Sequence, residues 1–240
     1  MMAAQIGRNM ITDKDISELE ERIGYHFNDR SLIATALTHS SFANEQKMNK
    51  RADYERLEFL GDSVLEMVSS TFLYKNYPDK KEGEMTKMRA SMVCEQALAF
   101  CAKDIELAKY IMLGKGEEMT GGRHRDSIVS DVMEAVIGAI YLDGGIEKAT
   151  NHINKFILND LEDKQIFVDA KSKLQELVQR NASSTLEYEI CGEIGPEHDK
   201  IFKSRVLIDG QILGEGEGHT KKAAQQQAAY KAVLKLSNKL

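Results

Sequence analysis

The stretch Tyr54-Glu55-Arg56-Leu57-Glu58-Phe59-Leu60-Gly61-Asp62-Ser63-Val64-Leu65 is the most informative part of this sequence. With about 100° between successive residues of a helix, one face of it is apolar and is made of Leu57, Leu60, Val64, Val68 and Thr71. The opposite side, within about 80°, carries four acids, which are Glu55, Glu58, Asp62 and Glu66. The stretch therefore predicts an amphipathic helix whose polar face is acidic.

A second acidic stripe occurs in residues 126–142. Asp131 and Glu134, with Gly138 after them, lie opposite an apolar face made of Val129, Val132, Val136 and Ile140. Acids opposite an apolar face are most often the solvated side of a surface helix. Two details disfavour that interpretation. Neither stripe carries interleaved Lys or Arg at the i, i+4 spacing that supports an exposed face, and Phe59 lies on the acidic side, where an exposed aromatic indicates a partner contact.

Four carboxylates would converge if the two stripes faced each other. Two like charges at ~4 Å repel by about 1 kcal/mol in water and by roughly 4 kcal/mol at an effective dielectric of 20. A divalent cation makes such an arrangement favourable, and ligands that are all oxygen favour magnesium or manganese over zinc. Such a centre suits phosphodiester hydrolysis, because the metal generates hydroxide and stabilises the charged transition state. Periodicity alone does not establish that the two helices meet.

The first 160 residues show the apolar spacing of successive helices. Helices are predicted over Asp13–Ile23, Asp29–Leu37, Tyr54–Tyr74, Glu82–Ala102, Ser127–Leu142 and Ile146–Leu161. Thr12 with Asp15 has the spacing of a capping box at the start of the first helix. Gly144-Gly145 predicts a break. No strand-like alternation of any length is found in this part of the sequence, so the pattern predicts an all-α domain.

The pattern changes after Asp160. A helix at about Lys171–Arg180 is followed by alternating apolar and polar residues around Leu186–Ile190 and Phe202–Ile208, by an Asp209-Gly210 hairpin turn, and by a helix over Lys221–Leu236. The sequence thus predicts an all-α domain over residues 1–163, a linker over 164–170, and a small α+β domain of order α-β-β-β-α over 171–238.

Composition narrows the class of protein. In 240 residues, 42% are hydrophobic and only 2 are Pro, which excludes collagen-like and wholly disordered chains and allows one or two domains with cores of their own. No apolar run approaches the ~18–20 residues of a membrane span, so no membrane partner is predicted. The 3 cysteines form no metal-type pair, which excludes zinc and disulfide frameworks and favours a cytoplasmic protein.

The net charge of −6 is unevenly distributed, with −7 in residues 1–167 and +1 in residues 168–240. This asymmetry suggests two units with different roles. Because phosphates require cations, an acidic protein binds nucleic acid only through a local basic surface or through bound metal.

The sequence Glu55-Arg56-Leu57-Glu58-Phe59-Leu60-Gly61-Asp62-Ser63 resembles the signature segment of the ribonuclease III family. The match continues in residues 36–41, 113–118 and 127–139, in the order found in the family, and covers residues 12–238. The resemblance implies a homodimeric, magnesium-dependent endonuclease for double-stranded RNA, with manganese as a substitute. Its products would carry 5′-phosphate and 3′-hydroxyl ends with a short 3′ overhang, and its substrates would be ribosomal precursor, messenger, transfer and other structured RNAs.

The resemblance also implies roles for individual residues. Glu58, Asp62, Asp131 and Glu134 would be the metal ligands, with Asp62 and Glu134 indispensable for catalysis. Glu55 would have a supporting, outer-sphere role, and Phe59 would pack into the partner subunit. A two-fold pair of sites could cut both strands of an A-form duplex. His39, within the segment 36–41, is expected to have a structural role at a helix end rather than to act as a general base.

Residues 171–238 resemble a double-stranded RNA-binding domain. Here the resemblance implies minor-groove contacts by Ser172, Gln175, Glu176 and His198, and phosphate contacts by Thr220, Lys221 and Lys222. Gly216 and Gly218 are expected to let the backbone turn into the last helix. Gln225 stands where many such domains carry a third basic residue, so we expect modest affinity.

Two other functions are compatible with parts of the sequence. A catalytically silent protein that binds double-stranded RNA would need no acidic cluster, and the presence of all four carboxylates argues against it. A phosphohydrolase for small nucleotides would not need the appended RNA-binding domain.

Overall fold

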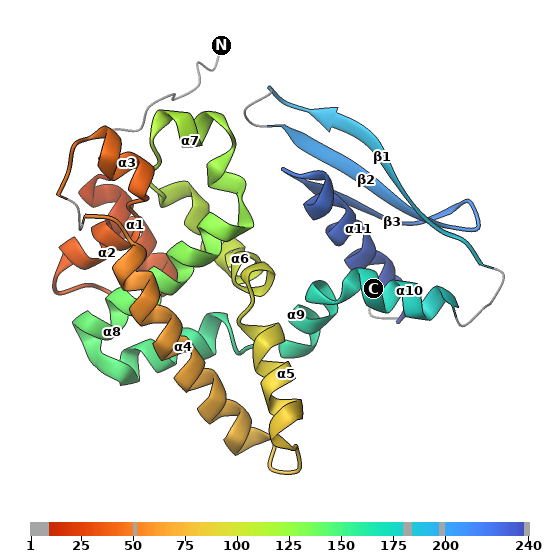
Figure 1. The fold of residues 1–240 in the computed structure, drawn as a ribbon, viewed down its shortest axis with the longest axis horizontal. Helices are drawn as coiled ribbons and strands as arrows, with labels where there is room; N and C mark the ends of the chain where they lie inside the picture. Colours follow the sequence, from red (N-terminus) through yellow and green to blue (C-terminus); the bar gives the residue numbers. More distant parts are fainter. Residues whose placement is uncertain (1–9, 50–51, 180–183, 197–199, 238–240) are drawn as a thin grey trace. The chain divides into compact units, whose positions relative to one another are not determined.

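The computed structural model describes residues 10–49, 52–179, 184–196 and 200–237, and the chain divides into two compact units, Met1–Asn159 and Asp160–Leu240 (Figure 1). In its described residues the first unit is helical, and the second combines helices with a three-stranded sheet. No helix in the described part of the chain is long and apolar enough to span a bilayer.

The helices of the first unit are α1 (Asp13–Ile23), α2 (Arg30–Ala36), α3 (Ser40–Glu45), α4 (Glu55–Asn76), α5 (Glu82–Met92), α6 (Glu95–Asp104), α7 (Lys115–Met119) and α8 (Asp126–Phe156), with 3₁₀ turns η1 (Leu107–Tyr110) and η2 (Gly122–His124). The helices predicted over Asp13–Ile23, Asp29–Leu37 and Tyr54–Tyr74 are confirmed with small shifts at their ends. The two predicted over Ser127–Leu142 and Ile146–Leu161 are parts of α8, and the short helices α3 and α7 were not predicted. Helix α1 begins at the predicted capping box, in which Thr12 accepts a hydrogen bond from the Asp15 backbone N–H. The predicted break at Gly145 is a kink inside α8, where φ is 78°.

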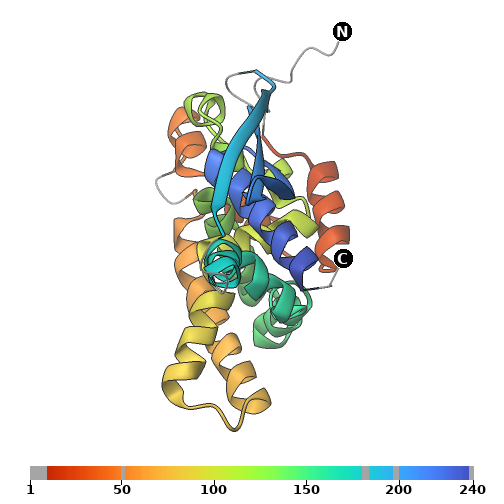
Figure 2. The same ribbon diagram turned by 90° about the vertical axis from the view of Figure 1, so that its right-hand side faces the viewer.

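Helix α8 is the centre of this unit, and α4 packs along it (Figures 1 and 2). Val132, Val136 and Ile140 are completely buried, and so are residues on the other sides of the helix, such as Met133 and Ile137. Helix α8 is therefore a core helix rather than the amphipathic surface helix that its acids suggested.

The single helix predicted over Glu82–Ala102 is wrong, because the chain breaks there into α5 and α6. Val93 and Cys94 leave the helical conformation, and Cys94 is extended with φ −71° and ψ 158°. Helix α5 packs on α4, whereas α6 packs on α8. The change of partner requires a change of direction that the apolar spacing, which runs on without interruption, does not reveal.

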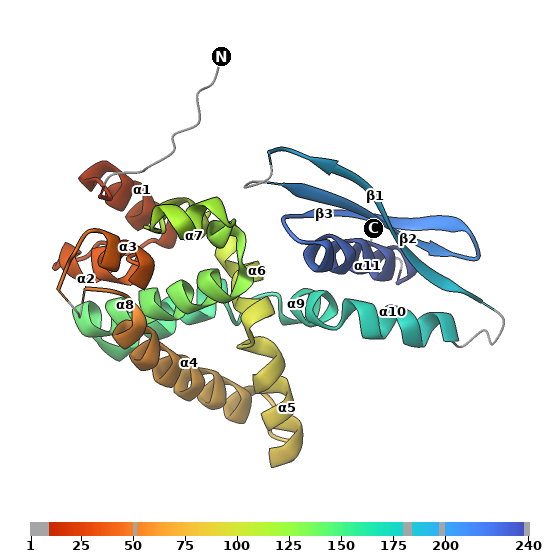
Figure 3. The ribbon, with the colours of Figure 1, turned by 45° about the horizontal axis from the view of Figure 1, so that its top comes forward.

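The second unit has the predicted α-β-β-β-α order. Strands β1 (Leu186–Ile194), β2 (Ile201–Ile208) and β3 (Gln211–Gly218) form an antiparallel sheet in the order β1-β2-β3. Helices α10 (Ala170–Gln179) and α11 (Lys221–Leu236) lie on one face of it (Figure 3). The predicted hairpin turn is present, with positive φ at both Asp209 (49°) and Gly210 (77°), as a type I′ turn requires.

The expected turning role of Gly216 and Gly218 does not match their geometry, since neither has a positive φ. Instead, a Cβ atom on Gly216 would lie 2.3 Å from the backbone nitrogen of Ala228, and one on Gly218 would lie 2.8 Å from the Cβ of Ala223. These glycines allow β3 to pack directly against α11.

The stretch that the sequence suggested as a linker, residues 164–170, is largely helical. Helix α9 (Leu161–Val168) packs against α11 and belongs to the second unit. The ring of Phe167 meets that of Tyr230 edge-on at 5.5 Å, and the Gln226 amide donates hydrogen bonds to the carbonyls of Phe167 (2.6 Å) and Val168 (2.9 Å). The mixed polarity of α9 conceals two apolar residues, Ile166 and Phe167, which are buried and pack in part against α11, about 60 residues away.

Candidate metal centre and RNA-binding surface

Helices α4 and α8 approach so closely that glycine is required where they cross. A Cβ atom on Gly61 would lie 1.8 Å from the carbonyl oxygen of Glu134, and one on Gly138 would lie 2.3 Å from the carbonyl oxygen of Leu57. Close-packed interiors leave no room for such overlaps, so a side chain at either position would force the helices apart. The crossing brings the acidic stripe of α4 beside Asp131 and Glu134 of α8.

The charges of neighbouring predicted ligands raise the pKa of Glu134 and of Glu58. Burial, followed by the negative charges of Asp62, Glu58 and Asp131, raises the pKa of Glu134 to about 8. Burial also raises the pKa of Glu58, and the charges of Asp131, Glu55 and Asp62 raise it further. The carboxylates therefore form a cluster, hereafter the acidic cluster, which comprises Glu58, Asp62, Asp131 and Glu134.

Among the described residues no ion pair reaches any of the four members of the acidic cluster, although the charge of His39 opposes the rise in the pKa of Asp131 that burial causes. The described side chains also do not form a preassembled cage of three or more His, Cys, Asp or Glu ligands. Glu58, Asp131 and Glu134 are partly buried, and neighbouring like charges there are unfavourable, so a cation would relieve their repulsion. Because every donor is a carboxylate oxygen, the set fits a hard divalent cation such as magnesium or manganese and not a metal that prefers nitrogen and sulfur.

The two remaining acids of the α4 stripe differ from each other. Glu66 lies outside the cluster and pairs with Arg89 of α5 at 3.6 Å, so its inclusion in a single functional stripe is not supported. Glu55 stays exposed at the start of α4 and raises the pKa of Glu58. Its supporting role stays a prediction.

His39 has the helix-end position that the sequence predicted. It is the N-cap of α3, where its Nδ1 accepts a hydrogen bond from the Ser41 backbone N–H at 3.1 Å. Burial lowers its pKa, although the negative charges of Glu117, Glu55 and Asp131 oppose that effect. His39 is therefore held by the backbone of α3.

Tyr54 joins the site although the sequence did not single it out. It directly precedes α4, is only 4% exposed, and donates a hydrogen bond from its phenol to Oδ2 of Asp131 at 3.4 Å. Its position next to Glu55 was visible in the sequence, but its contact with a residue 77 positions away was not.

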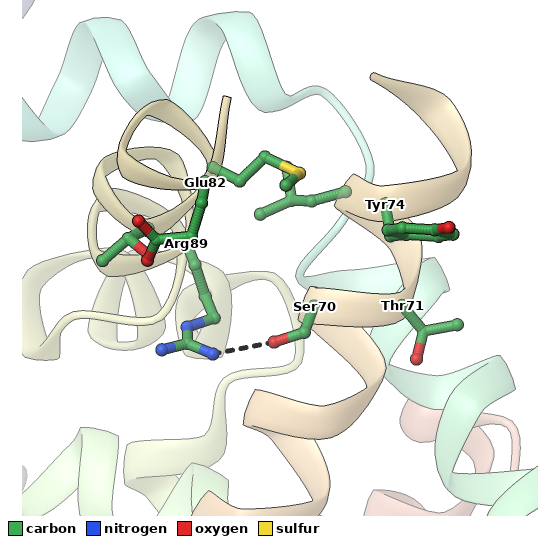
Figure 4. Close-up of a pocket in the computed structure, with 8 residues that line it drawn as sticks. Ser70, Thr71, Tyr74, Glu82 and Arg89 are labelled. Carbon is green, nitrogen blue, oxygen red and sulfur yellow. Dashed lines mark hydrogen bonds between the residues drawn. The ribbon is translucent and has the colours of Figure 1, made fainter. Parts of the chain in front are cut away.

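One face of α4 is apolar and exposed. Phe59 is 78% exposed, and Met67 and Tyr74 follow on the same side of the helix at 50% and 75%. Beside Tyr74, a hollow of about 460 Å³ lies between α4 and α5 (Figure 4). Its floor includes Arg89, which donates a hydrogen bond to Ser70 at 2.8 Å. Large apolar side chains exposed in this way mark an interaction surface.

The predicted RNA-binding residues of the second unit lie at exposed positions wherever they are described. Ser172, Gln175 and Glu176 are exposed on α10, and Lys221 and Lys222 are exposed in the first turn of α11. Thr220 is the N-cap of α11 and accepts a hydrogen bond from the Ala223 N–H at 3.0 Å, so its hydroxyl serves the helix. His198 lies outside the described residues.

Lys171 is a further cation of this surface that the sequence did not identify. Its ammonium donates a hydrogen bond to Gln225 at 2.7 Å and lies 4.9 Å from the centre of the Tyr188 ring. Burial and the positive charge of Lys222 lower its pKa, so the two ammonium groups are near each other. Gln225 therefore holds a lysine of α10 at this surface, and the modest affinity expected from Gln225 stays a prediction.

Comparison with known proteins agrees with both units. A family model described as "Ribonuclease-III-like" matches residues 29–161, and one described as "Double-stranded RNA binding motif" matches residues 170–236. The chain is 47% identical over 224 residues to "Ribonuclease 3" of Listeria welshimeri, covering 92% of this chain and 98% of that protein. It is 48% identical, with the same coverage, to "Ribonuclease 3" of Caldanaerobacter subterraneus.

A solved structure is similar to the first unit. The nuclease domain of ribonuclease III from Campylobacter jejuni, described for structural flexibility in a region involved in dimer formation, superimposes with a TM-score of 0.56 at 39% identity and covers 59% of this chain and 95% of that one.

Proposed function

Because the chain belongs to the ribonuclease III family and is an endonuclease for double-stranded RNA, we propose that it uses magnesium to cleave both strands of RNA duplexes. The products would carry 5′-phosphate and 3′-hydroxyl ends with a short 3′ overhang, and manganese would substitute for magnesium. The natural substrates would be ribosomal precursors and other structured transcripts, including messenger and transfer RNA precursors, processed in the cytoplasm.

The observation that carries this proposal is the acidic cluster, in which burial and three neighbouring acids raise the pKa of Glu134 to about 8. Asp62 and Glu134, which are brought together by the contact of Gly61 with the Glu134 backbone, would be the indispensable ligands, and Glu58 and Asp131 would complete the set. The four carboxylates would hold a divalent cation, whose chemistry when bound would be to activate a water and to neutralise charge that develops on the phosphate. The protein's own contribution is to hold the four carboxylates at a fixed separation.

The second unit would deliver the duplex. Ser172, Gln175, Glu176 and His198 would contact minor-groove edges and 2′-hydroxyls. Lys221 and Lys222, supported by the N-terminal amides of α11 that Thr220 caps, would contact phosphates. Such contacts recognise the shape of an A-form helix, so sequence preference would be weak.

A homodimer would place two acidic clusters on one duplex. Phe59 supports this proposal, since it is 78% exposed on the same helix that carries Glu58 and Asp62. An isologous interface on this face would pair each Phe59 with the partner subunit and hold two clusters in a fixed relation. The offset between the two sites would set the length of the overhang.

Cleavage of a 5′-labelled perfect duplex in increasing magnesium tests the proposal. Fragments that accept ligation at their 3′ ends without prior phosphatase treatment would support 3′-hydroxyl products. Duplex binding without cleavage, in either magnesium or manganese, would favour the alternative of a catalytically silent binding protein.

A further inference from the structure

Two segments resemble the ribonuclease III family but have no part in the reaction proposed above. They are residues 36–41, between α2 and α3, and residues 113–118, which lead into α7. The structure connects both to the acidic cluster through one side chain, that of Tyr54. Its phenol donates to Oδ2 of Asp131 at 3.4 Å, and the residue is 4% exposed.

Residues 36–41 fix Tyr54 from one side. The Tyr54 backbone N–H donates to the carbonyl of Thr38 at 2.9 Å, and its ring lies 5.7 Å from that of His39 with the two planes tilted by 57°. His39 is itself immobilised, because its N–H donates to the Met112 carbonyl at 3.0 Å and its Nδ1 accepts from Ser41. Tyr54 is thus held through its backbone N–H, and its ring lies beside the ring of His39.

Residues 112–114 form hydrogen bonds with residues 36–41, the segment that holds Tyr54. The Met112 N–H donates to the Leu37 carbonyl at 2.7 Å, and the Gly114 N–H donates to the hydroxyl of Ser41 at 2.9 Å. A Cβ atom on Gly114 would lie 2.8 Å from the Ser41 carbonyl oxygen, so the two segments are in direct backbone contact. Both family segments therefore form a frame for Tyr54 rather than a second reactive site.

We propose that Tyr54 is a positioning residue of the metal centre, whose phenol holds Oδ2 of Asp131 and thereby orients this carboxylate toward a bound cation. This inference rests on the proposed function, because it takes Asp131 as a ligand. Partners that donate hydrogen bonds to a ligand fix its orientation, and their removal typically costs about 10- to 100-fold in metal affinity or activity. Tyr54 suits that role because it is buried, its backbone N–H is hydrogen-bonded to Thr38, and its ring lies beside that of His39.

The test is the substitution Tyr54→Phe, which removes the phenol and keeps the buried ring. Tyr25→Phe is a matched control in the same unit, because Tyr25 also donates from its phenol to a carboxylate, Oδ2 of Asp143, at 2.6 Å. Equilibrium binding of Mn²⁺, followed through the electron paramagnetic resonance signal of the free ion, gives a readout that does not depend on cleavage. Thermal unfolding without metal reports on the fold.

We expect Tyr54→Phe to weaken Mn²⁺ binding about 10-fold and to raise by a similar factor the magnesium concentration for half-maximal cleavage. Tyr25→Phe should lower the melting temperature and leave Mn²⁺ binding unchanged. In an Asp131→Asn background, adding Tyr54→Phe should weaken Mn²⁺ binding no further.

Wild-type Mn²⁺ binding in Tyr54→Phe would overturn the inference, and so would a further 10-fold loss in the Asp131→Asn background, because Tyr54 would then act through something other than Asp131. A wild-type protein that binds no Mn²⁺ would overturn the proposed metal centre together with the inference. Normal Mn²⁺ binding by both the wild type and Tyr54→Phe would overturn the inference alone.

Discussion

Gly61→Ala separates the geometry of the acidic cluster from its chemistry, because it changes no charged residue. The added Cβ would lie 1.8 Å from the Glu134 carbonyl oxygen, 2.6 Å from the carbonyl carbon and 3.0 Å from the nitrogen of Gly138. Restoring ordinary van der Waals contact requires the two helices to separate by about 1.5 Å. All three atoms belong to the backbone of α8, so no flexible side chain can yield.

The expected magnitudes follow from that overlap. Overpacking of this severity costs about 3 kcal/mol, and the better helix propensity of Ala returns about 1 kcal/mol, which leaves a net loss of about 2 kcal/mol. In a chain of this size, that lowers the melting temperature by about 4–8 °C. Activity should fall more steeply, by about 100-fold, because the separation moves Asp62 away from Glu134 by more than an active site tolerates.

Gly83→Ala is the matched control, since Gly83 lies in α5 and nothing is within 4 Å of its added Cβ. It should keep full activity and gain up to about 1 kcal/mol of stability. Differential scanning calorimetry and single-turnover cleavage of a duplex measure both quantities. A Gly61→Ala protein as stable and as active as Gly83→Ala would refute the close crossing of α4 and α8 and the placement of the cluster that depends on it.

Three further predictions concern acid stability, the dimer and RNA binding. His152 is buried without a hydrogen-bond partner for either ring nitrogen, and burial lowers its pKa to about 3. The imidazole therefore binds a proton more readily in the unfolded chain than in the folded protein. As the pH falls below 6.5, the free energy of unfolding decreases by about 1.4 kcal/mol per pH unit until the pKa of the folded state is reached. His152→Leu should remove that slope in urea unfolding at pH 7, 6 and 5, and parallel slopes for the two proteins would contradict this assignment. Phe59→Ala should raise the dimer dissociation constant at least about 100-fold in sedimentation equilibrium, since each of the two copies loses about 1.5–3 kcal/mol of apolar burial. An unchanged dissociation constant would exclude this face of α4 as the dimer interface. Lys222→Met should weaken duplex binding and reduce the slope of log K against log salt by about 1, while Lys235→Met at the far end of α11 should leave the slope unaltered; equal slopes for the two variants would place the phosphates elsewhere.

Many elements of both units could be predicted from local patterns. Apolar spacing predicted α1, α2, α4 and the two parts of α8, and Asp209-Gly210 predicted the hairpin because only residues that tolerate positive φ fit that turn. The helices α3 and α7 were not predicted, because they are too short to show a helical period. The division of Glu82–Ala102 into α5 and α6 and the helical α9 were missed, since each depends on which distant helix the segment packs against.

The members of the acidic cluster were also visible in the sequence, but their meeting was not. What joins the two stripes is a backbone contact at Gly61 and Gly138, two residues that carry no chemistry of their own. For the same reason, Tyr54 and Lys171 were not identified, because their partners, Asp131 and Gln225, are 77 and 54 positions away. Local spacing predicts which residues share one face of a helix, whereas tertiary packing decides which other helix lies against that face.

The most direct test of the central claim is cleavage of a perfect RNA duplex on a denaturing gel in magnesium, comparing the wild type with Glu134→Ala. We expect cleavage by the wild type alone, with Glu134→Ala still binding the duplex, because the acidic cluster performs the chemistry and the second unit holds the RNA. Cleavage by Glu134→Ala at the wild-type rate would contradict the assignment of the chemistry to the acidic cluster. A wild type that binds duplex but does not cut it, in magnesium or in manganese, would contradict the proposed metal-dependent cleavage.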